Sequence, residues 1–315
     1  MTYPDSLSSR LGDRRADFPS LKRTHKGLPL VYLDGPAGTQ VPQQVIDAIS
    51  AYYTTCNANT HGQFPTAIES DRLLEQARRT VATFLGAPDS TTISFGANMT
   101  TLNYSLSHAI GRLLRTGDEI VITELDHEGN RGPWLGLRDQ GIVVREVAVL
   151  KNATLDYDDF DKKVNERTKL VAVGLASNAF GTVNDIARMR GIANRYGALL
   201  LADAVHYAPH FPIDVIALDV DYLLCSAYKF YGPHVGILYA KKGLLDRLET
   251  DRLRTQNQRA PYRIETGTLN HAAIAGVGAA IEYIATLGDG DDLRSKIVDG
   301  MRSIGAHERS VGKMI

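Results

Sequence analysis

Seven apolar runs of strand length, separated by stretches with helical periodicity, limit the folds that are open to this chain. The runs are TTISF (91–95), EIVIT (119–123), IVVREVAV (142–149), KLVAVG (169–174), ALLLAD (198–203), DYLLCS (221–226) and VGILYA (235–240). Strands that alternate with helices form a mostly parallel sheet with helices on both faces. The pattern therefore predicts an α/β fold around a seven-stranded, mainly parallel sheet.

The helical stretches have apolar positions at helical spacing and clear end signals. Helices are expected over residues 73–85, 102–113 and 185–197, and Gly86 followed by Pro88 closes the first of them. After the last strand, helical patterns run to Ile315. A helix that reaches the last residue without a stop signal indicates that the natural polypeptide continues.

These patterns also predict a domain organisation. Residues 1–30 are expected to belong to a small domain, and residues 31–280 to form the large domain. Residues 281–315 are expected to form a helix that leads to a C-terminal domain absent from this chain. The small domain is therefore expected to be incomplete.

Charge and cysteine content exclude several classes of partner. Lys and Arg total 35 against 36 Asp and Glu, so the net charge of -1 gives no footprint for nucleic acid or an anionic membrane. The two cysteines, Cys56 and Cys225, cannot supply a disulfide framework, which suits a reducing compartment. The N-terminal sequence lacks an apolar targeting segment, so a cytoplasmic protein acting on a small molecule is expected.

Polar residues that follow the apolar runs are the candidate site residues, because ligands in open α/β sheets bind at the carboxyl ends of strands. The candidates are Asp203, His127, Asn178, Lys229, Ser226 and the loop FGANM (95–99). Ala97, Asn98 and Met99 lead into a helix whose free N–H groups attract an anion such as phosphate. The same loop also reads as a simple strand-to-helix turn.

Two other kinds of site are weighed. No GxxxxGK[ST] occurs and no GxGxxG follows a strand, which argues against a P-loop or a dinucleotide fold. The stretch DAVHYAPH (203–210) places Asp203, His206 and His210 close together, as in a metal-dependent hydrolase. Pro209 lies between the two histidines, however, and no glutamate follows His206.

Lys229 is the most unusual candidate, because a lone amine stands between aromatic and apolar residues. It also reads as a lysine whose stem packs on apolar surface. A lysine that forms an imine, the carboxylate of Asp203 beside a ring nitrogen and a helix start for a phosphate together describe pyridoxal phosphate. One cofactor thus accounts for three features of the sequence.

The chain resembles the class V aminotransferase superfamily, and within it the cysteine desulfurase-like proteins, over nearly its whole length. The segments that carry the resemblance are the lysine segment CSAYKFYGPHVGILY (225–239), the aspartate segment DAVHYAPH (203–210), the ring-stacking histidine segment ELDHEGNRGPW (124–134), the dimer-contact segment RIETGTLN (263–270), DGPAGTQVP (34–42) and ASNAFGTVNDI (176–186). The resemblance implies a fold-type I transferase dependent on pyridoxal 5'-phosphate, and a homodimer with a shared active site.

The resemblance also implies roles for individual residues. Lys229 is expected to carry the cofactor as a Schiff base, Asp203 to hold the pyridine nitrogen and His127 to stack on the ring. Asn178 and His206 are expected to face the ring hydroxyl, although desulfurases commonly have glutamine where this chain has His206. The phosphate contacts implied are Ala97, Asn98, Met99 and Ser226, with Thr268 from a second subunit.

Departures from the family limit what the resemblance implies about the reaction. NANTHGQF (57–64) keeps His61 but lacks the arginine of the desulfurases, and their persulfide-forming cysteine and substrate-binding arginine belong to a C-terminal domain beyond residue 315. Desulfuration of an amino acid is the leading hypothesis. An aminotransferase, an epimerase, a C–S lyase and a non-catalytic cofactor-binding fragment stay open, beside the metal-dependent hydrolase.

Overall fold

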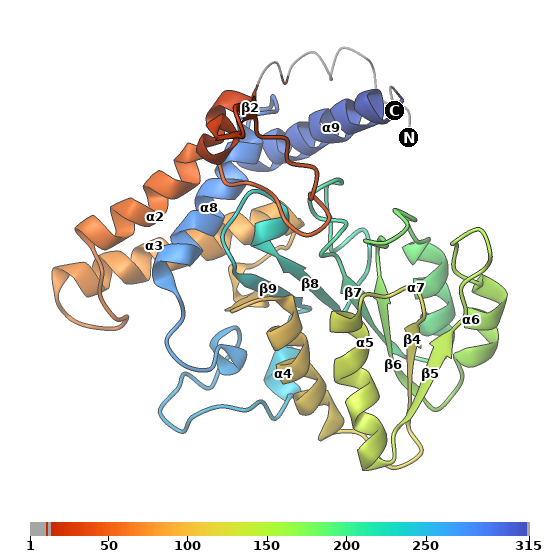
Figure 1. Ribbon diagram of the computed structural model, residues 1–315. Helices are drawn as coiled ribbons and strands as arrows, with labels where there is room; N and C mark the ends of the chain where they lie inside the picture. Colours follow the sequence, from red (N-terminus) through yellow and green to blue (C-terminus); the bar gives the residue numbers. More distant parts are fainter. Residues whose placement is uncertain (1–10, 12–13, 314–315) are drawn as a thin grey trace.

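The computed structural model describes Leu11 and residues 14–313, which form a central sheet with helices on both faces (Figure 1). Among these residues the main sheet has seven strands in the order β3-β9-β8-β7-β6-β4-β5. The strands are β3 (Ile93–Gly96), β4 (Glu119–Thr123), β5 (Val143–Val147), β6 (Thr168–Gly174), β7 (Leu199–Asp203), β8 (Tyr222–Ser226) and β9 (Gly236–Ala240). In this sheet β9 runs opposite to the other six strands, so the prediction of a mainly parallel, seven-stranded sheet is confirmed.

The helices of the described residues include the three that the sequence predicted. The α-helices are α2 (Gln43–Thr55), α3 (Pro65–Leu85), α4 (Met99–Gly111), α5 (Glu128–Leu135), α6 (Tyr157–Lys163), α7 (Ile186–Arg195), α8 (His271–Ala285) and α9 (Leu293–Gly312). Short 3-10 helices are η1 (Arg14–Asp17), η2 (Pro19–Lys22), η3 (Ser90–Thr92), η4 (Gly136–Gln140), η5 (Ala227–Lys229), η6 (Leu245–Arg247) and η7 (Tyr262–Ile264), and β1 (Thr24–His25) pairs with β2 (Leu28–Pro29). Gly86 ends α3 in the left-handed conformation, with φ 66°, as its position after the periodic residues predicted. The helix expected over 102–113 stops earlier, at Gly111, and Leu113 is exposed.

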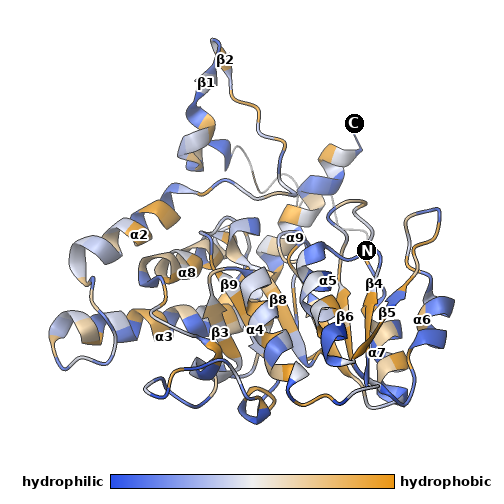
Figure 2. Ribbon diagram, turned by 60° about the horizontal axis from the view of Figure 1, so that its bottom comes forward, coloured by the Kyte–Doolittle hydropathy of each residue, from blue (hydrophilic) through white to orange (hydrophobic). Residues whose placement is uncertain are grey.

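Alternate residues of each strand face two different helix layers. In β8, Leu223 and Cys225 pack with α3, α7, α8 and α9, whereas Tyr222 and Leu224 pack with α4 and α5. Figure 2 shows the strands as hydrophobic along their length, as expected for a sheet buried on both faces. Among the helices of the described residues, none combines the length and the apolar sequence that crossing a membrane requires.

The parallel strands bring distant loops to one edge of the sheet. In the ladder, Gly174 at the end of β6 lies opposite Asp203 at the end of β7, and Asp203 lies opposite Leu224 of β8. The segments that follow β4, β6, β7 and β8 therefore meet at the carboxyl edge. This edge is where the candidate residues gather.

Candidate active site

A cavity of about 460 Å³ lies at the carboxyl edge of the sheet. This volume is within the range of roughly 300–1,000 Å³ that is usual for small-molecule sites. The predicted residues that line it are Met99, His127, Asn178, Asp203, His206, Ser226 and Lys229. Residues that the sequence did not single out also line it, namely Asp34, Pro36, Ala37, Thr100, Asp126, Gly174, Ala176, Val205 and Tyr228.

Lys229 is a buried amine at the end of η5, directly after β8. Its Nζ donates to the carbonyl oxygen of Pro36 and lies 5.3 Å from the centroid of the Tyr228 ring. Burial lowers the pKa of Lys229, and the nearby carboxylates of Asp203 and Asp34 oppose this shift. Burial therefore favours the neutral amine of Lys229, which is the form that can act as a nucleophile or base.

The N-terminal segment 34–39 holds the turn that carries Lys229. The Thr39 N–H donates to the Tyr228 carbonyl at 2.9 Å, and the Tyr231 N–H donates to Thr39 Oγ1 at 2.7 Å. Gly38 lies against the Tyr228 ring, which a Cβ at that position would approach to 3.2 Å. The Gly- and Pro-rich sequence of this segment signals a turn, but nothing in it signals the contact with residues far along the chain.

Asp203 is a buried carboxyl at the end of β7, with 7% of its surface exposed. Burial raises its pKa to about 7, against the opposing effects of the Val205 N–H and Lys229. The Val205 N–H donates to Asp203 Oδ1 at 2.9 Å. A carboxyl held in this way favours a cationic partner in the cavity, because such a partner would restore its ionised form.

Asp126 is a second carboxyl in the cavity, and no pattern in the sequence indicated a role for it. Its Oδ2 accepts from the Thr123 N–H at 3.0 Å and its Oδ1 accepts from the Gly174 N–H, so that it joins the ends of β4 and β6. Burial raises its pKa to about 6. A Cβ on Gly174 would lie 2.8 Å from Asp126 Oδ1, so this contact requires glycine. Its position directly before His127 was the one available signal.

His127 is the N-cap of α5, and its Nδ1 accepts from the Gly129 N–H at 2.9 Å. A ring nitrogen that accepts a hydrogen bond carries no proton, so neutral His127 has its proton on Nε2. Asn103 supports this turn from α4, because its Nδ2 donates to the Gly129 carbonyl at 2.9 Å. The ring is therefore fixed at the base of an exposed loop beside the cavity.

The start of α4 lines the Lys229 cavity, but the loop residues before it line a different cavity. The Met99 N–H donates to Ser226 Oγ at 3.0 Å, and Met99 and Ser226 line the Lys229 cavity. Ala97 and Asn98 instead line a neighbouring cavity of about 590 Å³, together with Thr268. Within one chain, the structure thus does not bring these three residues to the cavity that contains Lys229.

The two histidines after Asp203 are neighbours, with their ring centroids 5.0 Å apart, but only His206 lines the cavity. His206 lines the cavity, and burial together with the charges of His210 and Lys229 lowers its pKa. His210 instead pairs with Glu308 of α9, with 2.9 Å between Nδ1 and Oε1. Over residues 14–313 and Leu11, no group of three His, Cys, Asp or Glu side chains is arranged to hold a metal ion.

The sheet order, with a buried lysine after β8 and a buried carboxyl after β7, defines the class of fold-type I enzymes dependent on pyridoxal phosphate. Residues 31–296 match the aminotransferase class-V family, and the chain belongs to that family. It is 37% identical over 290 residues to a cysteine desulfurase of Enterobacter sp. (strain 638), covering 87% of this chain and 71% of that relative. The prediction of a cysteine desulfurase-like member of this pyridoxal phosphate-dependent family is therefore confirmed.

Solved structures give the same result. The cysteine desulfurase CsdA from Escherichia coli is 29% identical, with a TM-score of 0.78 over 94% of this chain and 74% of that one. A cysteine desulfurase from Thermococcus onnurineus NA1, solved in its apo form, is 26% identical, with a TM-score of 0.85 over 100% of this chain and 76% of that one. Both support the fold assignment over nearly the whole chain.

Proposed function

We propose that this chain binds pyridoxal 5'-phosphate through Lys229 and acts on a small amino acid as a cysteine desulfurase-like enzyme. The observation that carries the proposal is that Lys229, Asp203 and His127 line one cavity next to the start of α4. Cysteine is the proposed substrate because the relatives with 35–37% identity are named cysteine desulfurases. Transamination, epimerisation and C–S lysis are the alternative reactions.

The residues present fit this cofactor. The buried carboxyl of Asp203 lacks a cation that fully offsets its burial, and a protonated pyridine nitrogen would provide one. The lowered pKa of Lys229 suits an amine that bonds to an aldehyde. The Met99 N–H at the positive end of α4 donates to the Ser226 hydroxyl, and this end of the helix attracts an anion such as a phosphate.

Each residue then has a stated task. When bound, the cofactor supplies an electron sink for the α-carbon of the amino acid. Asp203 would hold a proton on the ring nitrogen, and His127 would lie against the ring with its Nε2 proton available to the substrate. Lys229 would move the α-proton of the amino acid as a general base. Asn178 and His206 would donate to the ring hydroxyl.

The phosphate site is proposed to be shared between two copies. Met99 and Ser226 would bind the phosphate from the same chain, together with the nearby backbone of Ala97 and Asn98. Thr268 is exposed and does not line the Lys229 cavity of its own chain, which supports a role for it in the site of a second copy. We therefore propose a homodimer.

The setting of the enzyme follows from the same proposal. Residues 31–280 would form the cofactor-binding domain, with residues 1–30 and 281–315 contributing to a smaller one. Both cysteines are free thiols, which supports a location in the reducing cytoplasm.

A lysine replacement tests the proposal. Lys229→Ala should abolish the visible absorption of the lysine-bound cofactor, and borohydride reduction followed by peptide mapping should place the cofactor on Lys229 in the parent protein. Lys242→Ala is the control, because Lys242 is exposed and pairs with Asp89 at 3.4 Å, outside the cavity. Cofactor found on another lysine would contradict the proposal.

A further inference from the structure

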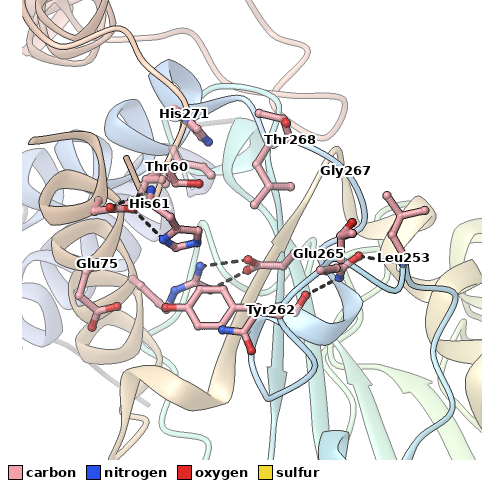
Figure 3. A pocket seen from close by; sticks show the side chains of 17 residues that line it. Thr60, His61, Glu75, Leu253, Tyr262, Glu265, Gly267, Thr268 and His271 are labelled. Atoms are coloured by element: carbon pink, nitrogen blue, oxygen red, sulfur yellow. Dashed lines mark hydrogen bonds and ion pairs between the residues drawn. The ribbon is translucent and has the colours of Figure 1, made fainter. Parts of the chain in front are cut away.

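A buried ion pair lies beside a cavity of about 370 Å³ that is separate from the Lys229 cavity (Figure 3). Arg78 of α3 and Glu265 form it, and their side chains are only 5% and 6% exposed. The guanidinium makes two parallel hydrogen bonds to the carboxylate, of 2.6 Å from Nη1 to Oε1 and 3.1 Å from Nη2 to Oε2. This two-pronged geometry fixes the relative orientation of the two side chains.

Both members of the pair are also bonded to β3. The Phe95 N–H donates to Glu265 Oε1 at 2.7 Å, and Arg78 Nη1 donates to the Ile93 carbonyl at 2.5 Å. The guanidinium lies 4.9 Å from the Phe95 ring centroid and 5.0 Å from that of Tyr262. The pair thus joins α3, the end of β3 and the segment around Glu265 in one fixed arrangement.

In the segment that follows Glu265, the Thr266 hydroxyl donates to the carbonyl oxygen of Asp251. Residues 266–268 are exposed, and Gly267 has a φ of 82°. Leu269, directly after Thr268, is partly buried and packs against the core. Thr268 therefore lies in a short exposed span, and Figure 3 shows it at the rim of the cavity that Glu265 also lines.

Stability alone does not account for such a pair. A buried ion pair is often no more stabilising than well-packed apolar residues of similar volume, because removing both charges from water is costly. What the apolar replacement lacks is the set of directed bonds that fixes the backbone at Glu265. The ion pair therefore differs from an apolar contact in one respect: it can hold the segment next to Glu265 in a defined position.

We propose that the Arg78–Glu265 pair is a positioning clamp that holds Thr268 in place to bind the phosphate of the cofactor in a second copy of the chain. The inference rests on the proposed function, which places Thr268 in the site of the partner. Arg78 and Glu265 act through Thr268 and contact no substrate. The pair is therefore expected to affect binding of the phosphate and not of the pyridine ring.

Two cofactor forms separate these effects, since pyridoxal lacks the phosphate of pyridoxal 5'-phosphate. Dissociation constants for both are measured on the dimer for four proteins: the parent, Thr268→Val, the double variant Arg78→Leu with Glu265→Leu, and the combination of all three changes. Loss of a hydrogen bond to a charged group weakens binding by about tenfold or more. The expected result is a loss of this size for pyridoxal 5'-phosphate, with less than about a twofold change for pyridoxal.

The combined variant decides whether the clamp acts through Thr268. If the combined variant binds pyridoxal 5'-phosphate as tightly as Thr268→Val alone, the clamp is supported. If its loss of affinity equals the product of the losses in Thr268→Val and in the Leu–Leu variant, the clamp is overturned. Parent-like affinity in the Leu–Leu variant also overturns the clamp while leaving the proposed dimer site intact. An unchanged affinity in Thr268→Val overturns the role of Thr268 itself, and the clamp with it.

Folding is monitored by thermal unfolding of each protein. If the Leu–Leu variant does not fold, Arg78→Lys replaces it, because lysine keeps the charge but cannot bond to both carboxylate oxygens. The control is Glu119→Gln, which alters a buried carboxylate bonded to Arg145 and Asn165 at the start of β4. It is expected to leave the ratio of the two dissociation constants unchanged.

Discussion

Replacing Asp203 by asparagine in the cofactor-free protein should raise stability and remove function at once. Burial raises the pKa of Asp203 from 3.8 to about 7, so the ionised form is disfavoured in the folded state. Asparagine has nearly the same shape and keeps an oxygen that can accept from the Val205 N–H. The substitution therefore removes the cost of the buried charge without removing the hydrogen bond.

The free-energy cost of burying the ionised Asp203 carboxyl depends on pH. Because the pKa is higher in the folded state, the cost is absent below pH 3.8 and increases until pH is about 7. A shift of this size corresponds to a cost of about 4 kcal/mol at pH 8, as an upper limit, and about 1.7 kcal/mol at pH 5. The gain in free energy of unfolding for Asp203→Asn should thus be about 2 to 3 kcal/mol larger at pH 8 than at pH 5.

Urea unfolding of the cofactor-free proteins at pH 5, 6, 7 and 8 measures this difference, at one protein concentration because the proposed dimerisation would make stability depend on concentration. Glu119→Gln is a control of opposite sign, since the Arg145 guanidinium lowers the pKa of Glu119 to about 2. Its stabilising effect is fully present above pH 4.5 and is lost only as the pH falls through about 2, so this variant should be destabilised equally at pH 5 and pH 8. A gain for Asp203→Asn that does not change with pH would refute the reasoning.

Two further predictions concern the fit of the cavity and the thiols. Gly174→Ala should weaken cofactor binding and lower the free energy of unfolding by about 1–3 kcal/mol, because its Cβ would lie 2.8 Å from Asp126 Oδ1. Gly191→Ala in α7 meets nothing within 4 Å and should instead stabilise by about 0.5–1 kcal/mol; equal effects in chemical denaturation would contradict the steric argument. Cys56 and Cys225 are both buried, and burial also raises the pKa of Cys225, so neither thiol should form a persulfide and both should react slowly with thiol reagents when the chain is folded. Rapid persulfide formation on either cysteine would show that a mobile thiolate is present.

The sequence by itself determined the strands, their class of sheet and most of the candidate site. Runs such as ALLLAD and DYLLCS are apolar along their whole length because both faces of a parallel sheet are buried, and this property is local. Residues placed directly after such runs, including Asp203 and Lys229, must then lie at the carboxyl edge. The sequence also indicated that the loop at 95–99 leads into a helix, but α4 begins at Met99, three residues before the expected 102.

Contacts between segments distant in sequence were decided only by the tertiary structure. The order of the strands sets which loops meet, and it brings Asp126 to Gly174 and Pro36 to Lys229. No periodicity encodes these pairs, because their members are 48 and 193 positions apart. The structure likewise divided the loop before α4, with Met99 at the cavity of Lys229 and its neighbours at another cavity.

The Arg78–Glu265 pair shows the same limit most clearly. Its members are separated by 187 positions, and a charged residue on a helix usually faces water. Both charges become buried only when α3 packs against β3 and the segment before α8. Burial is then tolerated because each charge has the other as its partner. The sequence determines which chemical groups the chain carries, whereas burial and pairing, which set their pKa values and orientation, depend on the assembled fold.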